Sequence, residues 1–249
     1  VITGKTALKK RKRKNSMNDN DKIYMEESRA VLIRGEAREN VVQPLLRERQ
    51  LVLYVNGREE TSFSCTPERI EELILGYLLS EGEIESLDEV TGMEIGRVQA
   101  EVICRRNRPE KERARQPAIF KPEEVRRYIS LFFERSFRHR KTHASHKAML
   151  FTAGQDSRFL EADDVSRRSA VEKVIGLGLK ERIVFEQSCL MFSGRVPADV
   201  VRKMKQVGIP LLIGRSYPTW EAVQEAKKSG LILCGNARED SFVLYAGNL

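Results

Sequence analysis

The 249-residue sequence has four cysteines, and no two of them stand at C-x-x-C spacing. They are Cys65, Cys104, Cys189 and Cys234. Zinc knuckles and local redox pairs use closely spaced cysteines, so neither can be read from this chain. Isolated cysteines in an intracellular protein are usually small buried hydrophobic residues. This interpretation suits Cys189 and Cys234 best, because they stand in apolar, strand-like runs.

Several catalytic and membrane signatures are also missing. The sequence has no G-x-x-x-x-G-K-[ST] phosphate loop, no G-x-G-x-x-G turn after a strand and no G-x-S-x-G nucleophile elbow. No apolar run approaches the roughly 20 residues that span a bilayer. The N-terminus lacks the apolar region of a secretory signal. We therefore expect a globular, cytoplasmic protein that does not bind membranes.

Positive charge is plentiful, with a formal net charge of +8. Six consecutive basic residues stand at 9–14. Such a run is most often a solvated arm. The more specific alternative is a segment that binds nucleic acid or an anionic membrane. The chain opens with Val1 and its first methionine is Met17, so a misassigned start codon could have added residues 1–16. We predict a disordered basic arm over residues 1–22 and give nucleic-acid binding little weight.

Strand-forming patterns follow this arm. β-rich runs cover residues 30–37 and 50–65, and the second run contains the pair Asn56-Gly57. An Asn-Gly pair between two β-rich runs is a strong hairpin signal. A further strand pair is expected over 90–105. The polar, basic segment 105–116 is expected to be an exposed loop.

A helix is predicted between these strands, over residues 66–84. Thr66 is its expected N-cap, with Pro67 at the first helical position. Apolar residues recur at helical spacing, and Gly82 is the expected C-terminal stop. We assign residues 23–116 to a smaller N-terminal α/β domain.

The second half, residues 117–249, has the pattern of one larger domain. The expected elements are a helix (121–137), a strand pair (147–153 and 158–164), a helix (164–179), and then strands at 182–188, 209–216 and 230–236 alternating with helices at 197–207 and 219–229. This alternation predicts a parallel sheet covered by helices.

In such a sheet the loops at the carboxyl ends of the strands gather at one edge and form the binding crevice. Here these loops are 193–195, 215–219 and 235–240. Arginines stand in them or at the start of the preceding helix, namely Arg167, Arg168, Arg195, Arg215 and Arg238. Guanidinium groups beside helix N-termini bind phosphate or pyrophosphate well. The alternative is that arginines are common here because the chain has 44 lysines and arginines.

The segment 163–176, DDVSRRSAVEKVIG, carries a structural and a binding signal together. Asp164 precedes an apolar-periodic segment and is a good N-cap. Arg167 stands at the helix start, where it can point toward an anion near the positive end of the helix. The two interpretations are compatible.

The three histidines, His139, His143 and His146, cluster in one basic segment. A metal site is disfavoured, because no cysteine or carboxylate nearby completes a ligand set and the neighbouring arginines and lysines would repel a cation. An anion-facing histidine is the better functional alternative.

Four segments, in order, resemble one known family. TPERIEELILGYLLSEGEIES (66–86) resembles T-P-x-x-x-x-E-L-x-x-G-F-L-x-x-E-G-I-I, and THASHKAMLF (142–151) is similar to T-G-G-x-H-x-A-x-x-F. The 163–176 segment resembles E-D-V-G-R-H-N-A-V-D-K-x-x-G. Segment 193–245 resembles S-G-R-x-S-x-E-x-V-x-K-x-x-x-x-G-I-P followed by S-x-P-T-x-x-A-V-x-x-A. On these motifs the chain is identified as a member of the formate dehydrogenase accessory sulfurtransferase family (FdhD/NarQ).

The resemblance implies a fold, an activity and partners. The implied fold is a cytidine-deaminase-like α/β/α domain with a smaller N-terminal α/β domain, without the deaminase zinc site. The implied activity is sulfur transfer from a cysteine desulfurase to the molybdenum cofactor, Mo-bis(molybdopterin guanine dinucleotide), on its way to formate dehydrogenase. A GDP-like nucleotide is an alternative ligand. The expected partners are therefore the desulfurase, formate dehydrogenase and a second copy in a homodimer.

The family segments and the predicted sheet edge together give the candidate cofactor-binding residues. They are His146, Asp164, Arg167, Lys173, Ser193, Arg195, Asn236, Ala237, Arg238, Glu239, Asp240 and Ser241.

The chain departs from the family at the sulfur-carrying C-G-x-C-G loop. The corresponding interval, 104–121, contains Cys104 alone. Arg105 and Arg106 could lower its pKa, but persulfide transfer needs a thiolate on a loop that reaches both donor and acceptor. Cys104 is thus a weak catalytic candidate. Two hypotheses follow: a sulfurtransferase that uses a single cysteine, and a divergent member that binds the cofactor or a guanine nucleotide without sulfur transfer. Ser166, Arg168 and Ser169, which replace Gly, His and Asn of the family pattern, are further departures.

Overall fold

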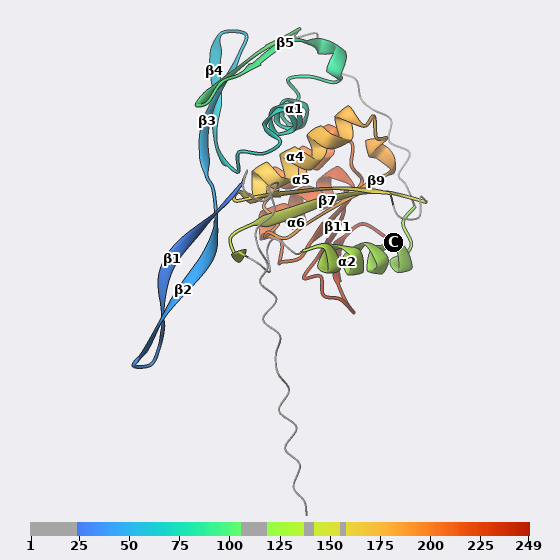
Figure 1. The fold of residues 1–249 in the computed structure, drawn as a ribbon. Helices are drawn as coiled ribbons and strands as arrows, with labels where there is room; N and C mark the ends of the chain where they lie inside the picture. The colour runs from blue at the N-terminus through green and yellow to red at the C-terminus, as the bar shows by residue number, and fades with distance from the viewer. Residues whose placement is uncertain (1–23, 106–118, 137–141, 155–157) are drawn as a thin grey trace, which may run out of the picture.

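The structure, a computed structural model, describes residues 24–105, 119–136, 142–154 and 158–249 (Figure 1). The predicted arm (1–22) and residues 106–116 of the predicted loop lie outside this part. The strands are β1 (Met25–Arg34), β2 (Ala37–Leu46), β3 (Arg49–Val55), β4 (Arg58–Cys65), β5 (Val90–Ile95), β6 (Gln99–Cys104), β7 (His146–Thr152), β8 (Phe159–Asp164), β9 (Ser188–Phe192), β10 (Leu211–Gly214), β11 (Ile232–Gly235) and β12 (Val243–Ala246). The helices are α1 (Ile70–Glu81), α2 (Pro122–Arg135), α4 (Arg167–Lys180), α5 (Ala198–Val207) and α6 (Trp220–Ser229), with short 3-10 helices at Leu87–Glu89 and Phe185–Gln187.

The largest sheet has six strands in the order β12-β11-β10-β9-β7-β8. Strands β9, β10 and β11 are parallel, as the alternating pattern predicts. Strands β7, β8 and β12 are antiparallel to their neighbours, so the sheet is mixed rather than parallel throughout. The reason lies in the connections. The links from β7 to β8 and from β11 to β12 are too short for the crossover that parallel neighbours require.

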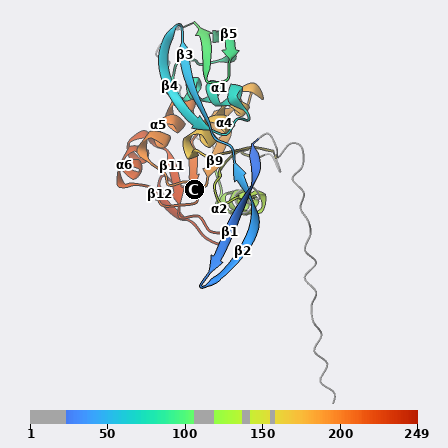
Figure 2. The same ribbon diagram turned by 60° about the vertical axis from the view of Figure 1, so that its left-hand side comes forward.

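A four-stranded sheet in the order β4-β3-β6-β5 forms the other side of the molecule. Strands β3 and β4 meet in a hairpin at Asn56 and Gly57, whose φ angles are 51° and 76°. This confirms the hairpin predicted from the Asn-Gly pair. Strands β1 and β2 form a separate antiparallel ribbon that projects from the body in both views (Figures 1 and 2). Its turn at Gly35 interrupts the single run predicted at 30–37, because Gly35 takes a φ of 60°.

Helices fill the space between the two sheets. Figure 1 shows α1 and α4 stacked between the four-stranded and the six-stranded sheet, with α2 on the opposite face of the larger sheet. One continuous apolar core joins β3 and α1 to α4 and α5, so it includes residues on both sides of the expected boundary at 116/117. A second core lies under α2 and includes Tyr128, Phe132 and Phe151. No helix in the described part of the chain is long and apolar enough to cross a membrane.

The α/β fold class expected from the sequence is therefore confirmed. The structure has mixed α/β architecture with a larger helix-covered sheet and a smaller sheet that precedes it in the chain. The further likeness to a cytidine deaminase stays a prediction.

Helices α1 and α4 approach each other backbone to backbone through one glycine from each. A Cβ atom on Gly76 would overlap the carbonyl of Glu172, and a Cβ atom on Gly176 would overlap the carbonyl of Glu72. Glycine inside a helix costs roughly 0.5–1 kcal/mol relative to alanine. These two glycines are tolerated because no larger residue permits so close a crossing.

Both helices begin later than the sequence predicts. Thr66 does not cap α1, which starts at Ile70 after Arg69 in a left-handed conformation (φ 53°). Asp164 does not cap α4, whose N-cap is Ser166, with the Ser166 hydroxyl accepting from the N–H of Ser169 at 3.3 Å. The side chains of Thr66 and Asp164 are used elsewhere, because both bind the buried ammonium of Lys173.

Smaller shifts affect other elements. The strand predicted at 182–188 is a 3-10 turn followed by β9, which begins at Ser188. The segment Ser188–Phe192 is wholly buried, as expected for a central strand covered on both faces. The Gly82 stop is confirmed: it caps α1 with a φ of 77°.

We expect Gly176→Ala to lower the free energy of unfolding by about 1–3 kcal/mol, although alanine is the better helix former, because its methyl group forces α1 and α4 apart. Urea unfolding followed by far-UV circular dichroism measures this change. Gly92→Ala is the matched control, since a Cβ there would lie in ordinary contact, 3.7 Å from Ile103. Equal stabilities of the two variants would contradict the proposed crossing.

Candidate functional site

The carboxyl ends of β9, β10 and β11 form one edge of the large sheet, as predicted. The loops that follow them are bound to each other through backbone hydrogen bonds. The N–H of Val196 donates to Tyr217 (3.3 Å), and the N–H of Thr219 donates back to Val196 (2.9 Å). On the other side, the N–H of Asn236 donates to Ser216 at 3.1 Å. The edge is therefore a connected surface built from three loops.

His146 reaches this edge because β7 runs antiparallel to β9. The amino end of β7 thus lies beside the carboxyl end of β9. His146 Nδ1 lies 3.2 Å from Ser193 Oγ, and the same hydroxyl accepts from the backbone N–H of Lys147 at 3.1 Å. The structure brings together two predicted site residues that are 47 positions apart.

Four of the five predicted arginines lie around the same edge. Arg167, the first residue of α4, covers Gly194, where an added Cβ would lie 2.9 Å from its Cδ. The Arg215 guanidinium stacks 5.4 Å from the Phe133 ring centre, and Arg238 donates to the carbonyl of Arg215 at 3.0 Å. Arg195 follows β9 and is exposed. Guanidinium groups, hydroxyls and a helix N-terminus at one edge can bind an anion.

Arg168 is the exception. It turns to α5, where its Nε donates to Asp199 at 2.6 Å. Its charge is therefore already paired, and it does not join the arginines of the edge.

The last predicted segment, 236–241, closes on itself beside the edge. The N–H of Arg238 donates to the carbonyl of Ser241 at 2.7 Å, and the Ser241 hydroxyl donates to Asp240 at 3.0 Å. Ala237 is buried, Asn236 is half-buried, and Glu239 and Asp240 are exposed. Two carboxylates on this loop make it less suitable for phosphate than the neighbouring arginine loops.

Asp164 and Lys173, also predicted to bind the cofactor, are enclosed inside the protein. Their charged groups lie 2.6 Å apart, and both side chains are fully buried. Lys173 also donates to the hydroxyl of Thr66 at 2.8 Å, and Thr66 donates its N–H to Asp164 at 3.1 Å. In this arrangement the pair joins α4 to the segment before α1, and neither side chain has a surface for a ligand.

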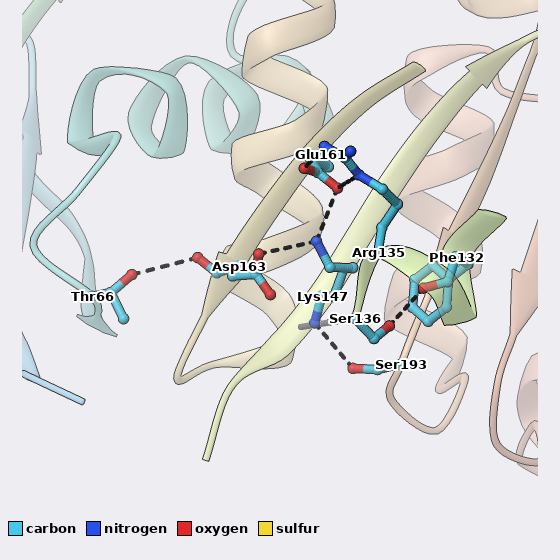
Figure 3. Close-up of polar contacts among 8 residues, drawn as sticks. All are labelled: Thr66, Phe132, Arg135, Ser136, Lys147, Glu161, Asp163 and Ser193. Atoms are coloured by element: carbon cyan, nitrogen blue, oxygen red, sulfur yellow. Dashed lines mark hydrogen bonds and ion pairs between the residues drawn. The ribbon is translucent and has the colours of Figure 1, made fainter. Parts of the chain in front are cut away.

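Figure 3 shows a second polar network, which the sequence analysis missed; Lys147 and Asp163 are buried in it, Glu161 is half-buried and Arg135 is exposed. The Lys147 ammonium donates to Glu161 and to Asp163, each at 3.1 Å, across the β7–β8 pair. Arg135 of α2 donates to Glu161 at 2.7 Å. Burial raises the pKa of Glu161, but the bonds and charges of Arg135 and Lys147 outweigh burial and hold that pKa below its usual value. The sequence signal was a lysine in the apolar strand HKAMLFT, paired with the acidic strand FLEADD.

All four cysteines are buried and none is disulfide-bonded. Burial raises the pKa of Cys65 to about 11 and that of Cys234 to about 12, and it raises the pKa of Cys189 as well. Cys104 ends β6 with only 6% of its surface exposed, and its backbone N–H and carbonyl bind the Asn56 side chain. The thiols are thus protected in this conformation. Among the residues that the structure describes, no three His, Cys, Asp or Glu side chains form a metal-binding group.

A comparison with protein-family models agrees with the resemblance seen in the sequence motifs. A model of the FdhD/NarQ family matches residues 46–119 and 106–248, which is most of the chain. The chain belongs to the FdhD/NarQ family.

Relatives in this family cover most of the chain. The sulfur carrier protein FdhD of Methanothermobacter thermautotrophicus is 30% identical over 85% of this chain and 92% of its own length. That of Sulfurisphaera tokodaii is 32% identical over 72% of this chain and 79% of its own length. The crystal structure of a protein described as a formate dehydrogenase accessory protein from Desulfotalea psychrophila has the same fold. It superposes with a TM-score of 0.76 and 23% identity, covering 90% of this chain and 97% of that one.

The FdhD/NarQ segments of this chain converge on the sheet edge. The histidine segment supplies His146, the start of α4 supplies Arg167, and the loop after β9 supplies Ser193 and Arg195. The substituted family positions divide into two groups. Ser166 caps α4 and Ser169 donates its N–H to that cap, whereas Arg168 pairs with α5.

The buried ion pair gives a stability prediction. Lys173→Met leaves the Asp164 carboxylate buried without its counter-ion, so we expect a loss of about 3–5 kcal/mol of unfolding free energy. Adding Asp164→Asn should restore a large part of this loss. Circular dichroism during urea unfolding measures both. Arg126→Gln, which breaks an exposed pair with Glu123, is the control and should change stability by less than about 0.5 kcal/mol. A Lys173→Met loss no larger than that of the control would contradict this role.

Proposed function

We propose that this FdhD/NarQ chain is a formate dehydrogenase accessory protein that binds Mo-bis(molybdopterin guanine dinucleotide), or a guanine nucleotide derived from it, without transferring sulfur itself. The observation that carries the proposal is the edge formed by Arg167, Arg195, Arg215 and Arg238 beside His146 and Ser193. In addition, all four cysteine thiols are buried.

The chemistry of the ligand matches the chemistry of this edge. The cofactor carries two guanine nucleotides, each joined through a pyrophosphate. Pyrophosphate oxygens accept charge-assisted hydrogen bonds from guanidinium groups and from backbone N–H groups at helix N-termini. The start of α4 supplies such an N-terminus next to Arg167.

Sulfur transfer is the second candidate, because relatives in the family are named sulfur carriers. In this chain it would depend on Cys104, since no other cysteine stands between β6 and α2. Persulfide chemistry needs an accessible thiolate. Cys104 would have to leave its bonds with Asn56 at the end of β6 before it could meet a donor.

The partners follow from the proposed role. A formate dehydrogenase would receive the cofactor, and a cysteine desulfurase would be a partner only if sulfur transfer occurs. A homodimer and a cytoplasmic location stay predictions.

Arg195→Ala should weaken GDP binding by about 1.5–3 kcal/mol, which is about 10- to 150-fold in Kd, because a charge-assisted contact with phosphate is lost. Isothermal titration calorimetry on the full chain measures it. Arg58→Ala removes an exposed arginine on the far hairpin and should leave the affinity unchanged. An unchanged GDP affinity of the Arg195→Ala variant would show that Arg195 does not contact the nucleotide.

A separate experiment decides between the two candidates. After incubation with a cysteine desulfurase and cysteine, we expect intact-protein mass spectrometry to show no persulfide, because the thiols are buried. An added sulfur atom (about 32 Da) that disappears in Cys104→Ala would establish sulfur transfer and overturn the binding-only proposal.

A further inference from the structure

The segment after β10, Ser216 to Trp220, ends at the first residue of α6 and exposes two aromatic side chains beside the carboxyl end of β10. Tyr217 is 59% exposed and Trp220, the only tryptophan in the chain, is 74% exposed. Within the described ranges no other aromatic side chain is among the strongly exposed apolar residues. Tyrosine and tryptophan have a large apolar surface, and burying it is favourable. Their exposure three positions apart, one in the loop and one at the start of α6, is consistent with a binding surface.

This loop lies directly against the segment that carries Arg195. Val196 and Pro218 form a parallel β-bridge, and Val196 exchanges backbone hydrogen bonds with Tyr217 and Thr219. Arg195 immediately precedes Val196, and Trp220 immediately follows Thr219. Arg195 and Tyr217 therefore stand at matching positions beside this bridge, and Trp220 begins α6 directly after the hydrogen-bonded Thr219.

The loop is also held firmly in place. Thr219 caps α6, its hydroxyl accepting from the N–H of Ala222 at 3.2 Å. Pro218 lies against Gly235 of β11, where an added Cβ would lie 2.9 Å from the proline ring. The aromatic residues thus extend from a fixed backbone, which lowers the entropy cost of binding a ligand there.

We propose that Trp220, assisted by Tyr217, forms the stacking surface for the guanine base of a nucleotide whose phosphates contact Arg195. This inference rests on the proposed function, and it names the part of the ligand that the arginines do not recognise. A purine presents a flat π-face, and aromatic side chains stack on such faces with little dependence on base identity. Tyr217 and Trp220 occupy positions left variable in the S-x-P-T-x-x-A-V pattern. The surface would therefore be a property of this chain rather than of the motif.

The single tryptophan makes the test direct. The full chain is titrated with GDP and, separately, with pyrophosphate, by calorimetry and by tryptophan fluorescence. We expect GDP to quench the emission of Trp220 with the same Kd that calorimetry gives, and pyrophosphate to bind without quenching. Free N-acetyltryptophanamide titrated in parallel corrects for absorption by the nucleotide.

Variants separate stacking from phosphate binding. Trp220→Ala should weaken GDP about 5- to 100-fold and leave pyrophosphate affinity unchanged, while Trp220→Phe should keep most of the GDP affinity. Trp220 is exposed, so circular dichroism should show the fold of both variants intact. Wild-type GDP affinity in Trp220→Ala, or an equal loss for both ligands, would overturn the stacking surface and leave the arginine site standing. A wild-type chain that binds neither ligand would overturn the nucleotide site itself, and the stacking surface with it.

Discussion

The close crossing of α1 and α4 is the contact on which the rest of the structure depends. Two glycines, Gly76 and Gly176, let the helix backbones touch, and the apolar core continues across this contact. Because α1 covers the smaller sheet and α4 covers the larger one, the crossing fixes how the two sheets face each other. The Asp164–Lys173 pair, bound to Thr66, then fixes the end of the same helix pair.

The position of α4 also organises the ligand edge. The same helix that packs on α1 begins with Arg167 beside Gly194, at the carboxyl end of β9. Strand β7, which runs the opposite way to β9, brings His146 to that edge and places Lys147 in the buried network with Asp163 and Glu161. The edge therefore depends on β7, which carries the Lys147 ion pairs, and on α4, which packs closely against α1.

Local features of this fold could be predicted from the sequence, whereas features set by distant partners could not. The Asn56-Gly57 hairpin and the Gly82 stop depend on the conformations of the residues themselves. The gathering of Ser193, Arg195 and Arg238 followed from the rule that parallel strands end at one edge. The starts of α1 and α4 were wrong because Thr66 and Asp164 bind Lys173. Thr66 is 107 positions from Lys173 and 98 from Asp164, so a local pattern holds no sign of these contacts. The Lys147 network was missed for another reason: its partners are only 14 and 16 positions away, but the register of β7 against β8 decides which side chains meet.

That separation along the chain has a consequence for the order in which the protein can fold. Thr66 and Lys173 are 107 positions apart, and the core around α1 needs side chains from α4 and α5. During synthesis from the N-terminus, the face of α1 that packs on α4, including Gly76, therefore stays uncovered until residues near 180 have left the ribosome. Early fragments of this chain should depend on chaperones, since the first sheet cannot complete its own core.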